Sequence, residues 1–168
     1  LVDHLLEMSR LEAGELKLKK QSVDVRTVVS KTLQKLHVDL QHHQVRLQIA
    51  QNLPEILIDP SAIEQVFTNL IDNFVVHTPE GSWLEIEGYL EAHHLIIVLR
   101  DNGPGLPSED PEAVFGKFFR GTTKTLGGSG LGLSIAKGLV EAHGGTMSAR
   151  NRKGGGGEFV LRLPVSAP

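Results

Sequence analysis

A segment from residue 101 to 130 has little hydrophobic periodicity and is rich in glycine and proline. It lies between a continuous apolar run at 95–99 and an amphipathic pattern at 130–143. A stretch of this length without regular structure is uncommon inside a compact domain, and where it occurs it is usually functional. We therefore expect a ligand-binding loop whose two ends are held by a strand and a helix.

The rest of the chain alternates between helical and strand-like periodicity. Apolar residues at helical spacing predict helices at 1–13, 26–41, 60–77 and 130–143, and alternating patterns predict strands at 15–25, 45–49, 55–58, 83–90 and 94–101, with two more strands closing the chain. The strands at 83–90 and 94–101 are expected to form a hairpin. This order predicts an α+β fold, a two-layer sandwich in which helices cover one face of a single mixed sheet.

Length and composition exclude several classes of function. A chain of 168 residues suits one compact domain with perhaps one appended element. A net charge of −3, with scattered Lys and Arg, argues against nucleic acid as a partner. The absence of cysteine removes thiol chemistry and suits a cytosolic protein. No apolar run is long enough to cross a bilayer, so no direct membrane contact is expected of these residues.

Asn69 and Asn73 stand four residues apart on the helix predicted at 60–77. This spacing places both amides near one face, at the border of the apolar stripe. Neutral oxygen donors suit a hard cation such as Mg²⁺, which shares its coordination shell with phosphate oxygens. The alternative, which the spacing alone favours, is a pair of surface amides.

Asp101 follows the apolar strand and begins the sequence Asp-Asn-Gly-Pro-Gly, which includes Gly103 and Gly105. A carboxylate in this position could accept a hydrogen bond from an exocyclic amine, because the glycines let a flat ring approach the backbone. The same dipeptides are equally typical of a tight turn.

A second glycine-rich run leads directly into the last predicted helix and contains Gly128, Ser129, Gly130, Leu131 and Gly132. Free backbone N–H groups and the positive end of the helix dipole make such a turn a candidate phosphate site. It fits neither the dinucleotide-binding fingerprint nor the P-loop. A flexible linker remains the alternative interpretation.

Between the two glycine clusters lie three phenylalanines, at 115, 118 and 119, together with Lys117, Arg120 and Lys124. Aromatic anchors and cationic heads in one loop are typical of a mobile lid that closes over a polyphosphate. The alternative is a local hydrophobic cluster with solvated charges. The eight histidines show no metal-binding spacing with carboxylates, and we expect them to be solvated.

The order of these motifs is more specific than any one of them. Paired asparagines, Asp-x-Gly-x-Gly, a Phe-rich basic loop and Gly-x-Gly-x-Gly resemble the N, G1, F and G2 boxes of sensor histidine kinases, in the ATPase superfamily shared with gyrase, Hsp90 and MutL. The likeness runs from about residue 1 to 164. It implies a Bergerat-type ATP-binding fold at 15–168, preceded at 1–14 by the end of a dimerisation helix.

The resemblance also implies roles for individual residues. Mg²⁺ would bind Asn73 with support from Asn69, and Asp101 would accept from the adenine amine of ATP. The lid would span about 106–127, and further nucleotide contacts would come from His77, Gly103, Gly105, Phe118, Arg120, Lys124, Gly128, Ser129, Gly130, Leu131 and Gly132.

Two departures from the family pattern stand out. Phe74 and Val76 occupy positions where the family usually has alanine and lysine, and the loss of the lysine could weaken nucleotide binding or phosphoryl transfer. We expect Phe74 to alter core packing rather than to block a pocket. His77 is a poor replacement for an ammonium group because its imidazole is largely neutral near pH 7.

The phosphoacceptor motif of the family is absent, so the histidine that receives phosphate would lie outside this chain. The resemblance then implies a protein-histidine kinase domain whose partners are a phosphoacceptor helix and a response regulator, in a cytoplasmic part of a homodimeric protein that could be membrane-anchored. Two alternatives stay open: a degenerate regulatory module without kinase activity, and a gyrase-type ATP-driven clamp, which the lack of a catalytic glutamate at Asn69 disfavours.

Overall fold

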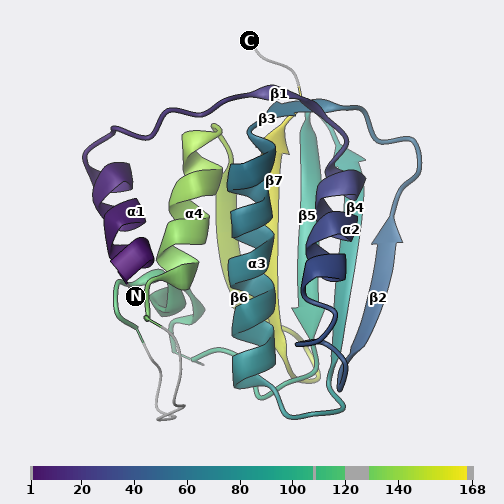
Figure 1. The fold of residues 1–168 in the computed structure, drawn as a ribbon. Helices are drawn as coiled ribbons and strands as arrows, with labels where there is room; N and C mark the ends of the chain where they lie inside the picture. Colours follow the sequence, from purple (N-terminus) through teal and green to yellow (C-terminus); the bar gives the residue numbers. More distant parts are fainter. Residues whose placement is uncertain (1, 108, 120–128, 166–168) are drawn as a thin grey trace.

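The computed structural model describes residues 2–107, 109–119 and 129–165, and these residues form two layers (Figure 1). One layer is a five-stranded sheet and the other contains the helices, all on one face of that sheet. The elements follow in the order α1 (Val2–Glu12), β1 (Gln21–Val23), α2 (Val25–Lys35), β2 (Gln44–Ile49), β3 (Ile56–Ile58), α3 (Pro60–His77), β4 (Trp83–Glu91), β5 (His94–Asp101), the 3-10 helix η1 (Pro111–Phe115), α4 (Gly132–Ala142), β6 (Thr146–Asn151) and β7 (Gly157–Pro164).

The large sheet has the strand order β2-β4-β5-β7-β6. Strand β2 runs parallel to β4, and every other pair is antiparallel, so the sheet is mixed. The α+β sandwich with helices on one face is therefore confirmed. A two-stranded sheet of β1 and β3 adds to it. Both strands lie within predicted ones, at 15–25 and 55–58, but a single mixed sheet was expected, so this second sheet was not predicted.

Helix α3 lies at the centre of the helical layer, and its bounds match the predicted ones. The Asp59 side chain caps it by accepting from the backbone N–H groups of Ser61 and Ala62, and Pro60 occupies the first turn. Burial tends to raise the pKa of Asp59, but these hydrogen bonds and those from the Lys19 amide and the Ser61 hydroxyl outweigh it and leave the pKa below its usual value.

The two faces of the sheet differ in chemistry. Alternate residues of β4, β5 and β7 point toward the helices and are buried with the apolar faces of α3 and α4. The opposite face carries Arg100, which donates to Glu85, Glu87 and Glu158 at 3.0, 2.6 and 2.7 Å. Glu158 is only 4% exposed. It is satisfied there because Arg150 also donates to it.

Three predicted elements were wrong in extent. The strand predicted at 15–25 is reduced to the three residues of β1, and the helix predicted at 26–41 ends at Lys35 in turns that bury Leu40. The region between β5 and α4 was expected to lack regular structure, yet it contains η1. Strand β1 is limited to the residues that pair with β3, whereas Leu40 and Val114 of η1 are buried in the core from turns that local periodicity does not predict.

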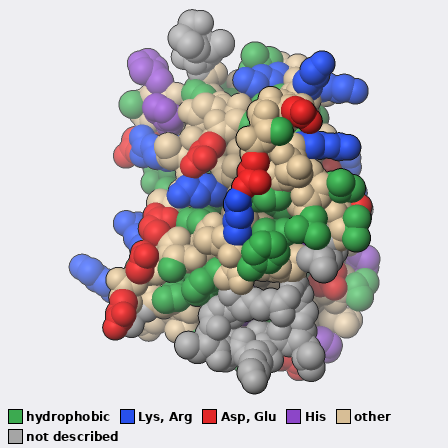
Figure 2. All heavy atoms as spheres, turned by 90° about the vertical axis from the view of Figure 1, so that its left-hand side faces the viewer, with side chains coloured by type: hydrophobic (Ala, Val, Ile, Leu, Met, Phe, Trp, Pro, Cys, Tyr) green, Lys and Arg blue, Asp and Glu red, His purple; other side chains and the backbone are tan. Residues whose placement is uncertain are grey.

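Helix α1 packs along α4 at one side of the molecule (Figure 1). Leu11 fits over Gly138, where a Cβ atom would lie 3.1 Å from a Leu11 methyl group. Val2, Leu5 and Leu6 remain exposed, and Figure 2 shows apolar side chains gathered among charged ones on this side. Among the described residues, no helix combines the length and apolar character needed to span a membrane.

Candidate functional site

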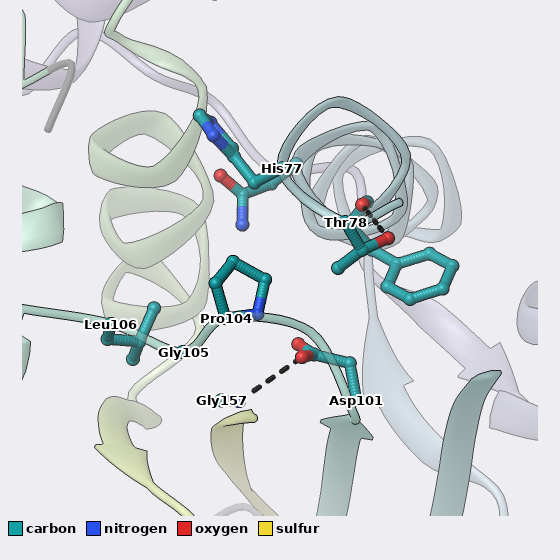
Figure 3. A pocket seen from close by; sticks show the side chains of 9 residues that line it. His77, Thr78, Asp101, Pro104, Gly105, Leu106 and Gly157 are labelled. Carbon is teal, nitrogen blue, oxygen red and sulfur yellow. Dashed lines mark hydrogen bonds between the residues drawn. The ribbon is translucent and has the colours of Figure 1, made fainter. Parts of the chain in front are cut away.

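A small open pocket lies between the C-terminal end of α3 and the loop that follows β5. The start of β7 closes it from below (Figure 3). Its lining consists of Asn73, Phe74, His77, Thr78, Asp101, Pro104, Gly105, Leu106 and Gly157. Four of the predicted site residues, Asn73, His77, Asp101 and Gly105, are thus brought together although they come from two distant motifs.

Asp101 is the acidic group of this pocket. Its Oδ1 accepts from the backbone N–H groups of Gly103 at 2.8 Å and Gly157 at 3.2 Å, which fixes the carboxylate at the end of β5. Its Oδ2 has no hydrogen-bond donor among the described residues. The geometry leaves one carboxylate oxygen held by the protein and the other free to accept from a ligand.

The glycines of the loop permit close packing that other residues would prevent. A Cβ on Gly103 would lie 2.5 Å from the Thr78 methyl carbon, and Gly105 has a φ of +88° with Asn151 Oδ1 only 2.8 Å from where its Cβ would stand. A larger residue at Gly103 would push the loop away from the end of α3, and one at Gly105 would push it away from Asn151 of β6. The predicted role of Gly103 and Gly105 in shaping the pocket therefore has a steric basis.

The last turns of α3 supply the other polar groups. Asn73 is half-buried and lines the pocket. His77 has an exposed edge, but partial desolvation of its imidazole lowers its pKa, so that near pH 7 it is neutral. Val76 is 39% exposed and does not line the pocket, so hydrophobic surface stands where the family has a lysine.

Phe74 is buried, as predicted, and it packs edge-on against His43 with 4.8 Å between the ring centroids. It also forms part of the pocket wall, which the prediction of a purely core role missed. The pocket remains open beside it. The substitution therefore shapes the wall without closing the site.

Asn69 connects the pocket helix to the second glycine cluster. It is buried, and its Nδ2 donates to the carbonyl oxygen of Gly132 at 3.0 Å. The amide nitrogen thus ties α3 to the first residue of α4. The prediction that the two asparagine amides converge on one cation is untested, and the contact assigns Asn69 a structural task in addition.

The N-terminus of α4 has no side-chain cap among the described residues. Leu131 is buried at the N-cap position, and its own N–H donates to Ser129 Oγ at 3.2 Å. The Ser129 hydroxyl also contacts His4 Nδ1 of α1 at 2.6 Å. Gly130 has a φ of +73°, and a Cβ there would lie 2.7 Å from the Phe118 Cα. The first backbone N–H groups of α4 are left available to an anion.

The loop predicted as a lid is only partly described. Arg120, Lys124 and Gly128 lie outside the described residues. Phe118 is 57% exposed, while Phe115 packs edge-on against Phe159 at 6.1 Å between centroids. Phe115 therefore anchors one end of this loop to the sheet.

Sequence reasoning missed five residues of the pocket wall, namely Phe74, Thr78, Pro104, Leu106 and Gly157. Thr78 and Pro104 adjoin predicted residues, and the run of four glycines at 154–157 was an available signal for a close approach. The expectation that the histidines are solvated is wrong for His143, which is 5% exposed and bonded at both ring nitrogens.

Comparison with known proteins gives a consistent result. The family model described as "Histidine kinase-, DNA gyrase B-, and HSP90-like ATPase" matches residues 58–167. Sensor protein KdpD of Escherichia coli (strain K12) is 36% identical over 98% of this chain, which spans 18% of that protein. Sensor histidine kinase WalK of Bacillus subtilis (strain 168) is 32% identical over 98% of the chain, which spans 28% of it.

Solved structures agree with the sequence matches. The histidine kinase AdeS of Acinetobacter baumannii superimposes with a TM-score of 0.83 at 25% identity, covering 99% of this chain and 78% of that one. The chain thus spans less than a third of the full-length KdpD and WalK sequences.

Proposed function

The chain belongs to the histidine kinase-, DNA gyrase B- and HSP90-like ATPase family, and from this premise we propose that it is the ATP-binding catalytic domain of a two-component sensor histidine kinase. Its task is to hold Mg²⁺-ATP so that the γ-phosphate reaches a histidine outside residues 1–168. The intact protein would then pass the phosphate to a response regulator.

The observation that carries this proposal is the arrangement of Asp101 in the pocket. One carboxylate oxygen is held by two backbone amides, and the other has no donor among the described residues, in a pocket that Gly105 and His77 also line. A fixed acceptor in a small pocket suits the exocyclic amine of adenine. The guanine ring has a carbonyl oxygen at the equivalent position, so the same geometry favours ATP over GTP.

The phosphates would extend from the base pocket toward the N-terminus of α4, whose first N–H groups lack a side-chain cap among the described residues. The side chain of Asn69 ties this end of α4 to α3. The bond keeps the helix terminus at a fixed distance from the base pocket, which orients the nucleotide for transfer.

The donor set also suits Mg²⁺. Asn73 lines the pocket and offers a neutral amide oxygen, a ligand type that Mg²⁺ accepts together with water and phosphate oxygens. We assign Mg²⁺ to Asn73, with Asn69 in support. When bound, the ion would neutralise charge on the phosphates. His77 adds no cationic charge near pH 7 because partial desolvation lowers its pKa.

The remaining residues extend the proposal to the whole chain. Residues 1–14 would be the end of a dimerisation helix, and residues 15–168 the catalytic domain. Helix α1 packs on α4, and its exposed Val2, Leu5 and Leu6 suit contact with further helices. The phosphoacceptor helix would come from the same or a second protomer of a homodimer, with the catalytic domain in the cytoplasm.

The proposal is tested by calorimetric titration of the chain with ATP and GTP, with and without Mg²⁺. Asp101→Asn keeps the oxygen that binds Gly103 and Gly157 but replaces the free acceptor by an amide donor. We expect ATP affinity to fall about tenfold or more, the worth of a hydrogen bond to a charged group, and GTP affinity to hold or rise. Asp39→Asn, at an exposed position outside the pocket and the proposed lid, is the matched control.

Asn73→Ala addresses the metal separately. We expect it to reduce the gain in ATP affinity that Mg²⁺ provides, while binding without Mg²⁺ changes little. Exposed Asn52→Ala serves as its control. If the folded wild-type chain binds no ATP under either condition, the kinase proposal is wrong and the degenerate regulatory module takes its place.

A further inference from the structure

The turn between β6 and β7, residues 151–157, packs against the loop that carries Asp101. Asn151 Oδ1 accepts from the Leu106 backbone N–H at 2.7 Å, and Asn151 Nδ2 donates to the Leu106 carbonyl at 3.0 Å. One side chain therefore satisfies both main-chain groups of a residue that lines the pocket. Two hydrogen bonds from one side chain fix the position of the main chain at Leu106.

Arg152 holds the other end of the same loop. Its Nη1 donates to the Asp101 carbonyl oxygen at 2.9 Å and to the Gly155 carbonyl oxygen at 3.1 Å. Its guanidinium lies over the Trp83 ring, with Cζ 4.7 Å from the ring centroid. A planar cation stacked on an aromatic face loses freedom to rotate, so its donors stay aimed at the two carbonyls.

Further contacts join Trp83 to this arrangement. The Trp83 backbone N–H donates to Asn102 Oδ1 at 2.7 Å, which anchors the residue directly after Asp101. Arg46 stacks on the same indole at 5.0 Å. Since Gly157 N–H binds Asp101 Oδ1, the turn contacts Asp101 through both its carbonyl and its carboxylate.

From these contacts we infer that Asn151 and Arg152 are positioning residues for base recognition. They hold the 101–106 loop by its two ends, so that the free oxygen of Asp101 stays directed into the pocket. Neither side chain lines the pocket. The inference rests on the proposed function, in which Asp101 accepts from the adenine amine, and it assigns selectivity for that amine to a turn about fifty residues further along the chain.

The alternative is that these contacts only stabilise the sheet. The two roles predict different nucleotide profiles. A loss of overall stability would lower the affinity for ATP and GTP by the same factor. A loosened Asp101 loop would weaken the hydrogen bond to the 6-amino group, which only ATP offers, and would leave the affinity for GTP unchanged.

The test is titration of Asn151→Ala and Arg152→Met with ATP and GTP under conditions where each variant is folded by circular dichroism. Lys153→Met, on the same turn and with the same loss of charge, is the matched control. We expect ATP affinity to fall about threefold to tenfold in both variants, because each lost hydrogen bond contributes a modest free energy. The ratio of ATP affinity to GTP affinity should fall by the same factor, because GTP affinity is unchanged. The control should keep the wild-type ratio.

Trp83 provides a second readout because it is the only tryptophan in the chain. Its emission should change when ATP binds to the wild type and should lose most of that change in Arg152→Met, where the stacked guanidinium is absent. Wild-type ATP binding combined with unchanged ATP-to-GTP ratios in both variants would overturn the positioning role alone. A wild type that binds no ATP would instead overturn the proposed function, and the positioning role with it.

Discussion

Replacing Gly156 by alanine tests how closely the start of β7 is fitted against the main chain of Asp101. Gly156 has a φ of +92°, and a Cβ there would lie 1.9 Å from the Asp101 carbonyl oxygen and 2.7 Å from its carbonyl carbon. Both atoms belong to the backbone, so no side-chain rotation can relieve the contact. The turn would have to move away from β5.

The size of the effect follows from the contacts that this movement breaks. A left-handed backbone costs alanine about 1–2 kcal/mol. Moving the turn also loses the bonds from Arg152 Nη1 to the Asp101 carbonyl and from Gly157 N–H to the Asp101 carboxylate, each worth about 0.5–1.5 kcal/mol. We expect Gly156→Ala to lower the free energy of unfolding by about 2–5 kcal/mol.

Gly154→Ala is the matched control, because Gly154 has a φ of +91° and nothing within 4 Å of its Cβ position. Gly154→Ala should lower the free energy of unfolding only by the cost of a left-handed backbone at alanine, about 1–2 kcal/mol. Urea denaturation followed by circular dichroism measures both values, provided that the slope with denaturant is unchanged. Equal losses in the two variants would refute the steric argument and with it the tight contact between the turn and Asp101.

Two further predictions concern buried polar groups. Asn69→Ala removes the hydrogen bond from α3 to the Gly132 carbonyl of α4 and should lower the free energy of unfolding by about 1–3 kcal/mol. The same urea assay measures this, and an unchanged urea midpoint would contradict it. His143 donates from Nδ1 to the Leu139 carbonyl and accepts at Nε2 from the Asp59 N–H, and burial lowers its pKa. The unfolded chain then takes up the proton first, so stability should fall as the pH drops below about 6.5, with a shallower slope in His143→Gln.

Much of the fold could be predicted because long segments repeat their pattern. The apolar stripe of α3 and the Asp59-Pro60 start define that helix, and the alternation in β4 and β5 defines the hairpin. Strands were also predicted at 15–25 and 55–58, where β1 and β3 lie, but their pairing in a separate sheet could not be predicted, since three residues leave no pattern that selects a partner strand. The end of α2 was placed too late because Leu40 continues the helical spacing while it is buried from a turn.

The candidate site was predictable to the extent that its residues lie in recognisable motifs. Asn73, His77, Asp101 and Gly105 meet in one pocket, and each belongs to a motif that signals chemistry by its composition. The turn at 151–157 carries a run of glycines that signals a close approach, but the sequence does not indicate which segment it approaches. Asn151 acts through a residue 45 positions away, and only the fold shows which main-chain groups it meets.

The register between β5 and β7 explains how a stable sheet and a ligand pocket share the same residues. Leu99 faces the core opposite Phe159, and Arg100 pairs on the other face with Glu158. Because successive side chains alternate, Asp101 points back to the helix side, just beyond the last pair, where it meets the Gly157 N–H. A slip by one residue would expose the apolar face and turn the carboxylate away from α3. The register is fixed by the partly buried Arg100–Glu158 ion pair on one face and by the apolar core on the other. The same interactions therefore also fix where the Asp101 carboxylate points.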